Sequence, residues 1–336
     1  MSKKIAIIGG GIIGCLTAIK LKESGFEVLV IDKHEIGKES SWAGAGILFP
    51  LMPWNYQPKI YDLSKLASSY YENFSKKLYE LTGIDPEYKK TGMTLIPPFE
   101  KDNAIKWANK QNLPYEEIFF RNFESIHFPS VAQIRSPRLM KSIKLFMKII
   151  GIKIIENMEL AEIGHVKGVV KKWPTKKNSF IEADYFVITS GAWTSNLKEN
   201  YKSKIYPVRG QMIQYKISNL NIGEILYSND FYILQRKDGV IIAGSTIEEV
   251  GFDETVTIDK KEALMRKAEE LIPDLANVQV ENHWAGFRPG TKENIPFIQK
   301  DNDYENVFVN SGHFRYGLTM APQSAENLNE ILIKSI

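Results

Sequence analysis

The sequence predicts an α/β protein that combines a Rossmann-like dinucleotide-binding domain with a second, antiparallel sheet. Three observations predict this fold class. Residues 4–33 follow a pattern of strand, glycine turn, helix and strand, residues 207–246 alternate like antiparallel strands, and residues 307–318 repeat the strand and glycine turn. A chain of 336 residues is too long for one simple core and about right for two domains.

The N-terminal unit places a glycine-rich turn between a strand and a helix. We expect a strand at Lys4–Ile8, a helix from about Ile12 to Ser24, and a second strand at Phe26–Lys33. The turn is Gly9-Gly10-Gly11-Ile12-Ile13-Gly14, a G-x-G-x-x-G pattern. In this context the pattern is typical of a dinucleotide-binding site. The alternative is a glycine turn that binds no ligand.

Each residue of this fingerprint has a physical role. Gly9 permits the tight turn, Gly11 lets the backbone approach a pyrophosphate, and Gly14 lets the helix pack close to the strand. The N–H groups at the start of the helix bind phosphates. Asp32 ends the second strand and accepts hydrogen bonds from ribose hydroxyls, which disfavours a cofactor with a 2′-phosphate. The fingerprint leaves NAD and FAD as alternatives.

The segment after Asp32 favours FAD. Residues 34–58, HEIGKESSWAGAGILFPLMPWNYQP, place mostly small residues in a row at 40–46, whereas an NAD-type unit would resume its strand and helix alternation. Such a row suits a backbone that passes close to a flat cofactor, and the alternative is a mobile glycine loop. Because Cys15 lies near the pyrophosphate end, we expect the FAD to be bound non-covalently.

Later segments predict the second sheet and further helices. A strand predicted at 183–193 ends in small residues, as does a strand that meets a ligand at its carboxyl end. The alternating patterns of the second sheet lie at 207–217, 231–237 and 240–246. The helical patterns lie at Ile60–Thr82, Arg138–Ile150 and Lys260–Leu271.

The C-terminal region repeats the arrangement of the N-terminal unit. A strand at Val307–Asn310 is followed by a turn at Gly312–Gly317 and by a helix from about Leu318. A helix that begins there directs its N-terminus inward, where it stabilises negative charge. In a flavoprotein this charge is that of the N1–C2=O edge of the reduced flavin ring.

The composition excludes several other classes of protein. The net charge of +3 is small and dispersed, so a nucleic-acid partner is not expected, and the densest basic run, 167–177, is typical of a solvated hairpin turn. With one cysteine and five histidines that never recur at metal-ligand spacing, we expect no metal. We also expect no membrane span, no secretory leader and a cytoplasmic location.

Five sequence blocks together resemble a known enzyme family. The blocks are, in order, IAIIGGGIIG, SSWAGAGIL, PVRGQ, WAGFRPGT and GHFRYGLTMAP. They resemble the D-amino-acid oxidase family of FAD-dependent oxidoreductases, most nearly the bacterial glycine oxidases of thiamine biosynthesis, from about Lys4 to Leu332. The resemblance implies an FAD-binding domain made of residues 1–80, 138–205 and 290–336, with an interleaved antiparallel substrate-binding domain made of residues 81–137 and 206–289.

The resemblance also implies which residues surround the cofactor and the substrate. Those that would line FAD are Gly9, Gly11, Ile12, Ile13, Gly14, Asp32, Lys33, Ser40, Ser41, Ala45, Gly46 and Ile47. Leu160 would contact the adenine through its backbone. Those that would surround the flavin ring are Gly312, His313, Phe314, Arg315, Tyr316, Gly317, Leu318 and Thr319. Tyr232, Arg288 and Arg315 would face the substrate.

Three positions depart from the glycine oxidase pattern. Tyr316 stands where those enzymes carry Asn, Ile47 replaces a longer side chain, and Gln299 replaces a Gly. The first two lie near the expected pocket and bear on the preference for glycine. The flavin assignment does not depend on them.

Arg288 is the residue that bears most directly on function. It lies in an apolar stretch, HWAGFRPGTKENIPFI at 283–298, and burying a guanidinium costs several kcal/mol unless an anion meets it. We interpret it as a clamp for a substrate carboxylate, with the hydroxyl of Tyr232 as a further donor. The alternatives are an internal ion pair with Glu293 or Glu281, and a Tyr232 that belongs to the core.

The reaction that follows is oxidative deamination of glycine, sarcosine or a D-amino acid. Hydride passes from the substrate Cα to flavin N5 and O₂ reoxidises the flavin, so the products are a 2-oxo acid, ammonia and H₂O₂. His313 packs against the flavin in this interpretation and is not a base. Two alternatives stay open: a D-amino-acid dehydrogenase that passes electrons to a quinone, and a non-catalytic flavoprotein subunit of an amine-oxidising complex. The sequence also leaves open a homo-oligomer.

Overall fold

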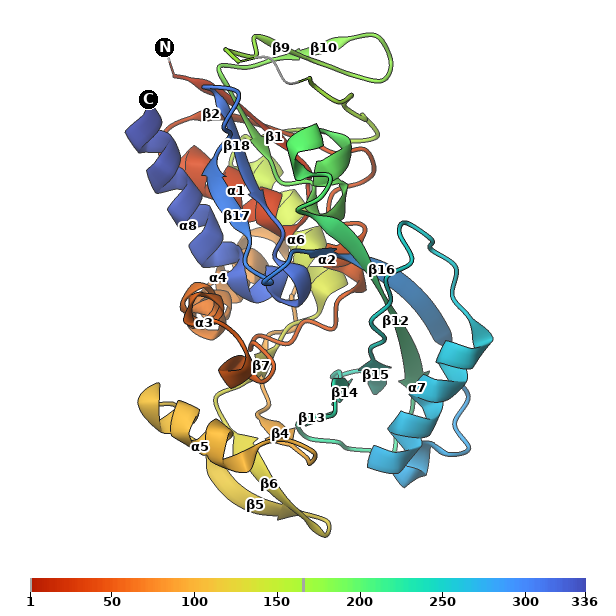
Figure 1. Ribbon diagram of the computed structural model, residues 1–336. Coiled ribbons are helices and arrows are strands. Elements are labelled where there is room, and N and C mark those ends of the chain that lie inside the picture. Colours follow the sequence, from red (N-terminus) through yellow and green to blue (C-terminus); the bar gives the residue numbers. More distant parts are fainter. Residues whose placement is uncertain (1, 165–166) are drawn as a thin grey trace.

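The fold is built from two large sheets, and Figure 1 shows their arrangement in a computed structural model that describes residues 2–164 and 167–336. The first sheet has six strands, in the order β17 (Phe297–Lys300), β18 (Val307–Ser311), β11 (Tyr185–Ile188), β1 (Lys4–Ile8), β2 (Glu27–Ile31) and β8 (Lys153–Ile155). All neighbours are parallel except β17, which lies antiparallel at the edge. Both chain ends lie beside this sheet.

The six-stranded sheet is covered on both faces. In β1, Ile5 and Ile7 join the core formed with helices α1 (Ile12–Glu23), α4 (Ala67–Thr82), α6 (Ser136–Ile149) and α8 (Gly317–Ser335). Ala6 and Ile8 join a second core on the opposite face, which includes Trp173 of the small β9–β10 sheet. Because successive side chains of a strand point to opposite faces, a strand buried on both faces is apolar throughout.

The second sheet has eight strands and is almost entirely antiparallel. Its order is β16 (Asn282–Gly290), β12 (Tyr206–Lys216), β15 (Val240–Gly244), β14 (Phe231–Gln235), β13 (Ile225–Ser228), β4 (Met93–Leu95), β6 (Phe123–Phe128) and β5 (Glu116–Phe120). Only the β13–β4 pair is parallel. Helix α7 (Ile258–Leu271) packs Leu264 and Ala268 on one face of this sheet. The register of the long β12–β16 pair places Gly210 opposite Gly286 and Val208 opposite Arg288.

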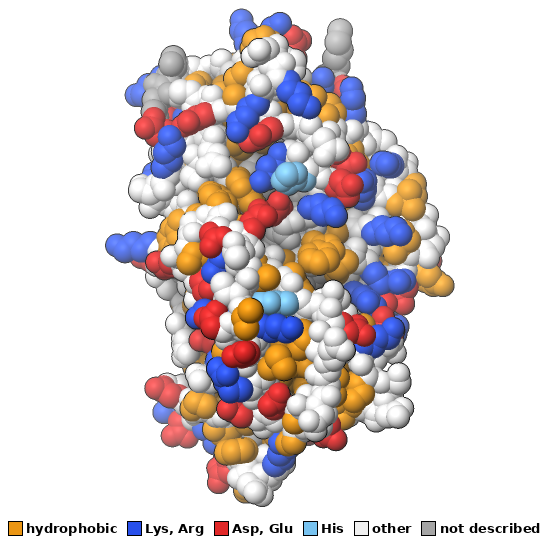
Figure 2. All heavy atoms as spheres, turned by 90° about the vertical axis from the view of Figure 1, so that its right-hand side faces the viewer, with side chains coloured by type: hydrophobic (Ala, Val, Ile, Leu, Met, Phe, Trp, Pro, Cys, Tyr) orange, Lys and Arg blue, Asp and Glu red, His pale blue; other side chains and the backbone are white. Residues whose placement is uncertain are grey.

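The remaining elements are short. They are α2 (Ser40–Ala43), η1 (Pro53–Asn55), α3 (Pro58–Ser64), β3 (Lys89–Lys90), α5 (Lys101–Lys110), β7 (Ala132–Gln133), β9 (Lys172–Pro174), β10 (Phe180–Glu182), η2 (Gly191–Asn196), η3 (Glu199–Tyr201), η4 (Pro273–Leu275) and η5 (Phe314–Tyr316). In the described part of the chain no helix is long and apolar enough to cross a membrane. On the face shown in Figure 2, acidic and basic side chains are interspersed.

The predicted fold class is confirmed, and two local predictions need correction. The single helix predicted at Ile60–Thr82 is two helices, α3 and α4, with a break at residues 65–66. The two halves contribute to different cores, since Ile60 and Leu63 pack with the second sheet while Tyr71 and Phe74 pack with the first. A straight helix could not serve both cores.

The second correction concerns the basic run at 167–177. Its residues 172–174 form strand β9, which pairs with β10. Its last residues, 175–177, do enter the predicted hairpin turn, where the Thr175 N–H donates to the Ser179 carbonyl over 2.9 Å. The predicted domain boundaries stay a prediction.

Candidate active site

A large cavity lies where residues of the two sheets meet. It holds about 1880 Å³ of empty space, its open mouth included, and its wall includes the β1–α1 turn, the α2 segment, β16 and η5. Most of the residues predicted for the cofactor and the substrate line it together. The three that do not are Gly14, Gly312 and Thr319.

The glycines of the first turn are required for close packing. A Cβ on Gly9 would lie 2.6 Å from the Thr189 carbonyl oxygen, and one on Gly14 would lie 1.9 Å from the Gly9 carbonyl oxygen. Gly14 therefore packs α1 against β1 and does not reach the cavity. Gly11 caps α1 without a side chain, which leaves the helix N-terminus open toward the cavity. Ser41 Oγ accepts a hydrogen bond from the Ile12 N–H over 2.9 Å.

Asp32 lines the cavity just beyond the end of β2. Its Oδ2 accepts from the Gly10 N–H over 2.6 Å, and its Oδ1 accepts from the His34 N–H over 2.8 Å. Burial raises the pKa of this carboxyl, against the effect of the two backbone hydrogen bonds. Each carboxylate oxygen has a second acceptor position, so Asp32 can still accept from a ligand hydroxyl.

The small-residue segment is held firmly against the rest of the fold. The Ser40 hydroxyl donates to the Phe287 carbonyl, and Gly46 has a φ of 75°, with a Cβ position only 1.9 Å from the Ile134 carbonyl oxygen. Arg236, which is buried, donates to the Ala45 carbonyl over 2.6 Å from behind the cavity wall. These contacts give the segment a defined path along the cavity.

The C-terminal turn brings a buried histidine next to the cavity. His313 is 1% exposed, and its Nε2 lies 2.9 Å from the Ser324 hydroxyl in α8. Burial lowers the pKa of His313 to about 3, so the imidazole is neutral near pH 7. Thr319 in the first turn of α8 donates to the Tyr316 carbonyl over 2.9 Å and lies 3.4 Å from the Ser64 hydroxyl of α3, so it does not reach the cavity.

Arg288 has no acidic partner among the residues that the structure describes. Its Nη1 donates to the carbonyls of Thr246 and Arg209 over 3.1 and 3.3 Å, and its Nη2 donates to the Ser245 hydroxyl over 2.6 Å. The two predicted alternatives for an internal pair lie elsewhere, because Glu293 accepts from Gln57 and Glu281 accepts from Gln214. Burial lowers the pKa of Arg288 to about 10, and Arg315 acts in the same direction. The guanidinium is therefore charged at pH 7 and uncompensated.

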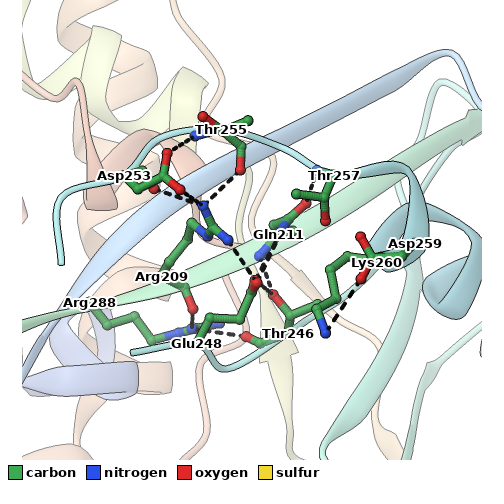
Figure 3. A network of polar contacts seen from close by, with 10 residues as sticks. All are labelled: Arg209, Gln211, Thr246, Glu248, Asp253, Thr255, Thr257, Asp259, Lys260 and Arg288. Carbon is green, nitrogen blue, oxygen red and sulfur yellow. Dashed lines mark hydrogen bonds and ion pairs between the residues drawn. The ribbon is translucent and has the colours of Figure 1, made fainter. Parts of the chain in front are cut away.

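A polar network behind Arg288 fixes the carbonyls that it contacts (Figure 3). Glu248 accepts from Arg209 Nη2 over 2.9 Å, from Gln211 Nε2 over 3.0 Å and from the Thr246 hydroxyl over 2.6 Å. Partial burial acts to raise the pKa of Glu248, but these hydrogen bonds hold it below its usual range. Since Arg209 and Thr246 both carry a carbonyl that accepts from Arg288, the network orients the guanidinium.

Tyr232 and Arg315 complete the polar groups at this end of the cavity. The Tyr232 hydroxyl lies 3.6 Å from Met212 Sδ, and the residue is buried. Arg315 Nη1 donates to Asp230 Oδ1 over 2.7 Å. The structure therefore brings all three predicted substrate residues to one cavity.

Several lining residues were not predicted. They include Phe49, Leu51, Met158, Thr189, Trp193, Gly210, Met212 and Ser245. Lys33 Nζ lies 3.7 Å above the Trp193 ring, a contact between positions far apart in the sequence. Thr189 and Trp193 lie in the segment 183–193, whose end was expected to meet a ligand, and Gly210 stands inside the PVRGQ block. The role of Gly210 nevertheless depends on a side chain from another strand.

The cavity suits the FAD that the resemblance implies. Its lining extends from Asp32 and Leu160 on one side to Tyr232 and Arg288 on the other, so it passes from the first sheet to the second. The N-terminus of α1, whose cap residue is a glycine, suits a pyrophosphate, Asp32 suits ribose hydroxyls, and the apolar side chains of Ile47, Leu51 and Met212 suit a flat ring system. The residues present therefore fit the group.

Comparison with known proteins identifies the family. The chain is 34% identical over 347 residues to a glycine oxidase of Pseudomonas putida, and the match covers 99% of this chain and 95% of the relative. Among solved structures, glycine oxidase from Bacillus cereus shares the fold with a TM-score of 0.90 at 23% identity, covering 100% of this chain and 96% of that one. L-proline dehydrogenase from P. horikoshii shares it with a TM-score of 0.87 at 21% identity, covering 99% and 94%. The model of the FAD dependent oxidoreductase family matches residues 4–331, and the chain therefore belongs to that family of FAD-using enzymes.

Proposed function

We propose that this enzyme oxidises a small amino acid, such as glycine, sarcosine or a D-amino acid, to a 2-oxo acid with release of H₂O₂ and of ammonia, or of methylamine where the substrate is sarcosine. The observation that carries the proposal is Arg288, a charged guanidinium that lines the cavity and has no acidic partner within residues 2–164 and 167–336. A buried cation of this kind is stabilised by an anion that arrives with the substrate. The similarity to the Pseudomonas putida glycine oxidase supports the same class of substrate.

The cofactor end of the cavity holds FAD non-covalently. The residues that hold it are Gly9, Gly11, Ile12, Ile13, Asp32, Lys33, Ser40, Ser41, Ala45, Gly46, Ile47, Leu160 and the turn at 313–318. When bound, FAD supplies the two-electron acceptor that takes a hydride from the substrate Cα and passes the electrons to O₂. Cys15, the single cysteine, is buried and bonded to the Gly10 carbonyl, so it holds no covalent flavin.

The substrate end positions the amino acid. Arg288 binds the carboxylate through two parallel hydrogen bonds, and Tyr232 donates its hydroxyl to the same group. The apolar side chains of Phe49, Leu51 and Met212 line the same cavity and exclude water from the reacting carbon. With the carboxylate fixed, the Cα–H has one orientation, so positioning supplies most of the rate.

No protein acid or base is needed for the proton balance. The CH–NH₂ group loses two electrons and two protons, water hydrolyses the resulting imine to the 2-oxo acid and ammonia, and O₂ takes up the electrons and protons as H₂O₂. His313 is neutral and bonded to Ser324, and burial raises the pKa of Tyr316 well above its usual value. Both side chains therefore stay in one protonation state during turnover. Cys15 is the single cysteine and forms no internal disulfide, which suits a cytoplasmic location.

Oxygen consumption tests the proposal directly. The purified, FAD-loaded protein should consume O₂ and release H₂O₂ with at least one of glycine, sarcosine or a panel of D-amino acids, together with ammonia, or with methylamine from sarcosine. Reduction of a soluble quinone without O₂ uptake would favour the dehydrogenase alternative. Failure of every substrate to bleach the flavin absorbance under anaerobic conditions would leave the non-catalytic flavoprotein.

A further inference from the structure

Two guanidiniums line the cavity, and in the described chain only one of them has a fixed counter-ion. Arg288 has no acidic partner in the described chain, whereas Arg315 is paired with Asp230 over 2.7 Å. The side chain of Arg315 is 6% exposed, and its Nη2 is buried with no hydrogen-bond partner in the structure. The two guanidiniums are close enough for Arg315 to lower the pKa of Arg288.

Asp230 sits in a turn that fixes its direction. It follows Asn229 in the two-residue connection between β13 and β14, and both residues have positive φ values, 46° and 61°. This is the geometry of a tight hairpin turn. The Tyr227 hydroxyl also donates to Asp230 Oδ1, over 3.0 Å. Asp230 therefore reaches Arg315 from a rigid position, although its own side chain is 59% exposed.

Asp230 is charged at pH 7. Partial burial acts to raise the pKa of this carboxyl, but the hydrogen bonds and charge of Arg315 outweigh it, with smaller help from Tyr227 and Lys267, and the pKa is lowered. Arg288 and Arg315 line this end of the cavity, and Asp230, which stands outside the lining, adds one fixed negative charge next to Arg315. The net charge of these three side chains is +1, which one further anionic group would neutralise.

We propose that Asp230 makes the pocket selective for substrates with a single carboxylate by occupying the second guanidinium, Arg315. This inference rests on the proposed function, because it takes Arg288 as the site of the first carboxylate. A substrate with a second carboxylate brings that group toward Arg315, where Asp230 already neutralises the cation and repels a further negative charge. Without the Asp230 charge, the same pocket presents two uncompensated guanidiniums and favours dicarboxylates.

Anion binding to the FAD-loaded enzyme tests this assignment without turnover. Acetate and succinate, which carry one and two carboxylates, are titrated by calorimetry into the wild type and into Asp230→Asn. Asparagine keeps the hydrogen bonds of the turn and tolerates a positive φ. In the wild type, succinate should bind no more tightly than acetate. In Asp230→Asn, the affinity for succinate relative to acetate should rise about tenfold, which corresponds to about 1.4 kcal/mol.

Asp238→Asn is the matched control. Asp238 also lies in a hairpin turn, between β14 and β15, and also pairs with an arginine, Arg135, over 2.8 Å. That pair does not line the cavity, so the succinate to acetate ratio should equal that of the wild type. If Asp230→Asn does not fold, Asp230→Gly removes the carboxylate and retains the turn.

The outcomes separate this inference from the proposed function. An unchanged succinate to acetate ratio in the Asp230 variants, or an equal change in Asp238→Asn, overturns the selectivity role. Failure of the wild type to bind acetate overturns it as well, because the inference requires that Arg288 is free to bind one carboxylate. If the ratio shifts as expected but no amino acid is oxidised, the proposed function fails and the role of Asp230 stands.

Discussion

The α-carbon of Gly210 lies directly against the guanidinium of Arg288. A Cβ built on Gly210 would be 2.3 Å from both Nη1 and Nη2 of Arg288. In the β12–β16 pair Arg288 is opposite Val208, and Gly210 is opposite Gly286. The arginine side chain therefore crosses diagonally to the neighbouring position of β12, and only glycine leaves space for it there.

Gly210→Ala should impair substrate binding more than stability. The added methyl group displaces the end of a flexible side chain, so the fold and FAD content should be retained. The displaced guanidinium loses its alignment, and carboxylate affinity should fall by about 10- to 150-fold, which corresponds to losing about 1.5–3 kcal/mol of charge-assisted hydrogen bonding. Steady-state KM and acetate binding measure the effect.

Gly164→Ala is the control for Gly210→Ala. Apart from its chain neighbours, no atom of the described residues lies within 4 Å of the Cβ position of Gly164, so alanine there should change neither KM nor stability. An unchanged KM in Gly210→Ala would mean that the position of Arg288 does not determine substrate binding.

Gly11→Val should yield protein without cofactor. A Cβ on Gly11 would lie 3.0 Å from Ser41 Oγ, and the branches of valine extend toward the open N-terminus of α1, where a pyrophosphate would bind. The absorbance of the purified variant and FAD release by acid report the cofactor content. One FAD per chain in this variant would show that the fingerprint has been misassigned.

His313 should make the enzyme less stable in acid. Its folded pKa of about 3 lies below the ordinary 6.5, so between these values the unfolded chain binds a proton that the folded chain does not. The free energy of unfolding should therefore fall as pH decreases through this range, by about 1.4 kcal/mol per pH unit for this one group.

Urea unfolding of His313→Gln from pH 6 to pH 4 measures the effect. Glutamine can still bond to Ser324, and the variant should show a smaller fall in the free energy of unfolding across this range. His34→Gln is the control, because the His34 side chain is 52% exposed and its removal takes away no buried group. Equal pH slopes in the wild type and His313→Gln would refute the prediction.

Local signals predicted the N-terminal unit nearly to the residue. β1 and α1 begin where the strand pattern and the glycine turn place them, at Lys4 and Ile12, because alternation and turn chemistry depend on neighbouring residues. The break between α3 and α4 was not predictable in the same way. Both helices continue one helical pattern, and the division follows from the two different cores that they join.

The surroundings of the substrate residues depended on contacts that no local pattern carries. Arg288 was recognisable as a cation in an apolar stretch, but the space for it comes from Gly210, and its orientation comes from the Glu248 network. Asp230 and Arg315 are 85 positions apart. Their pairing depends on a turn in the second sheet meeting a turn after the first sheet, which a single sequence does not reveal.

Arg288→Lys and Arg288→Ala should separate a substrate clamp from a structural role. Lysine keeps the charge but loses the planar fork, so carboxylate affinity should fall by about 10- to 150-fold, or about 1.5–3 kcal/mol. Arg288→Ala should lose more carboxylate affinity than Arg288→Lys. The oxidation of amines without a carboxylate should be comparatively unaffected. Fold and FAD binding should persist in both variants, because Arg288 neutralises no fixed acid of the described chain.

If Arg288 were instead one half of a buried pair, its removal would destabilise the fold by about 3–5 kcal/mol. Thermal unfolding of the substrate-free variants beside steady-state kinetics distinguishes the two, and a large loss of stability with an unchanged KM would exclude the clamp.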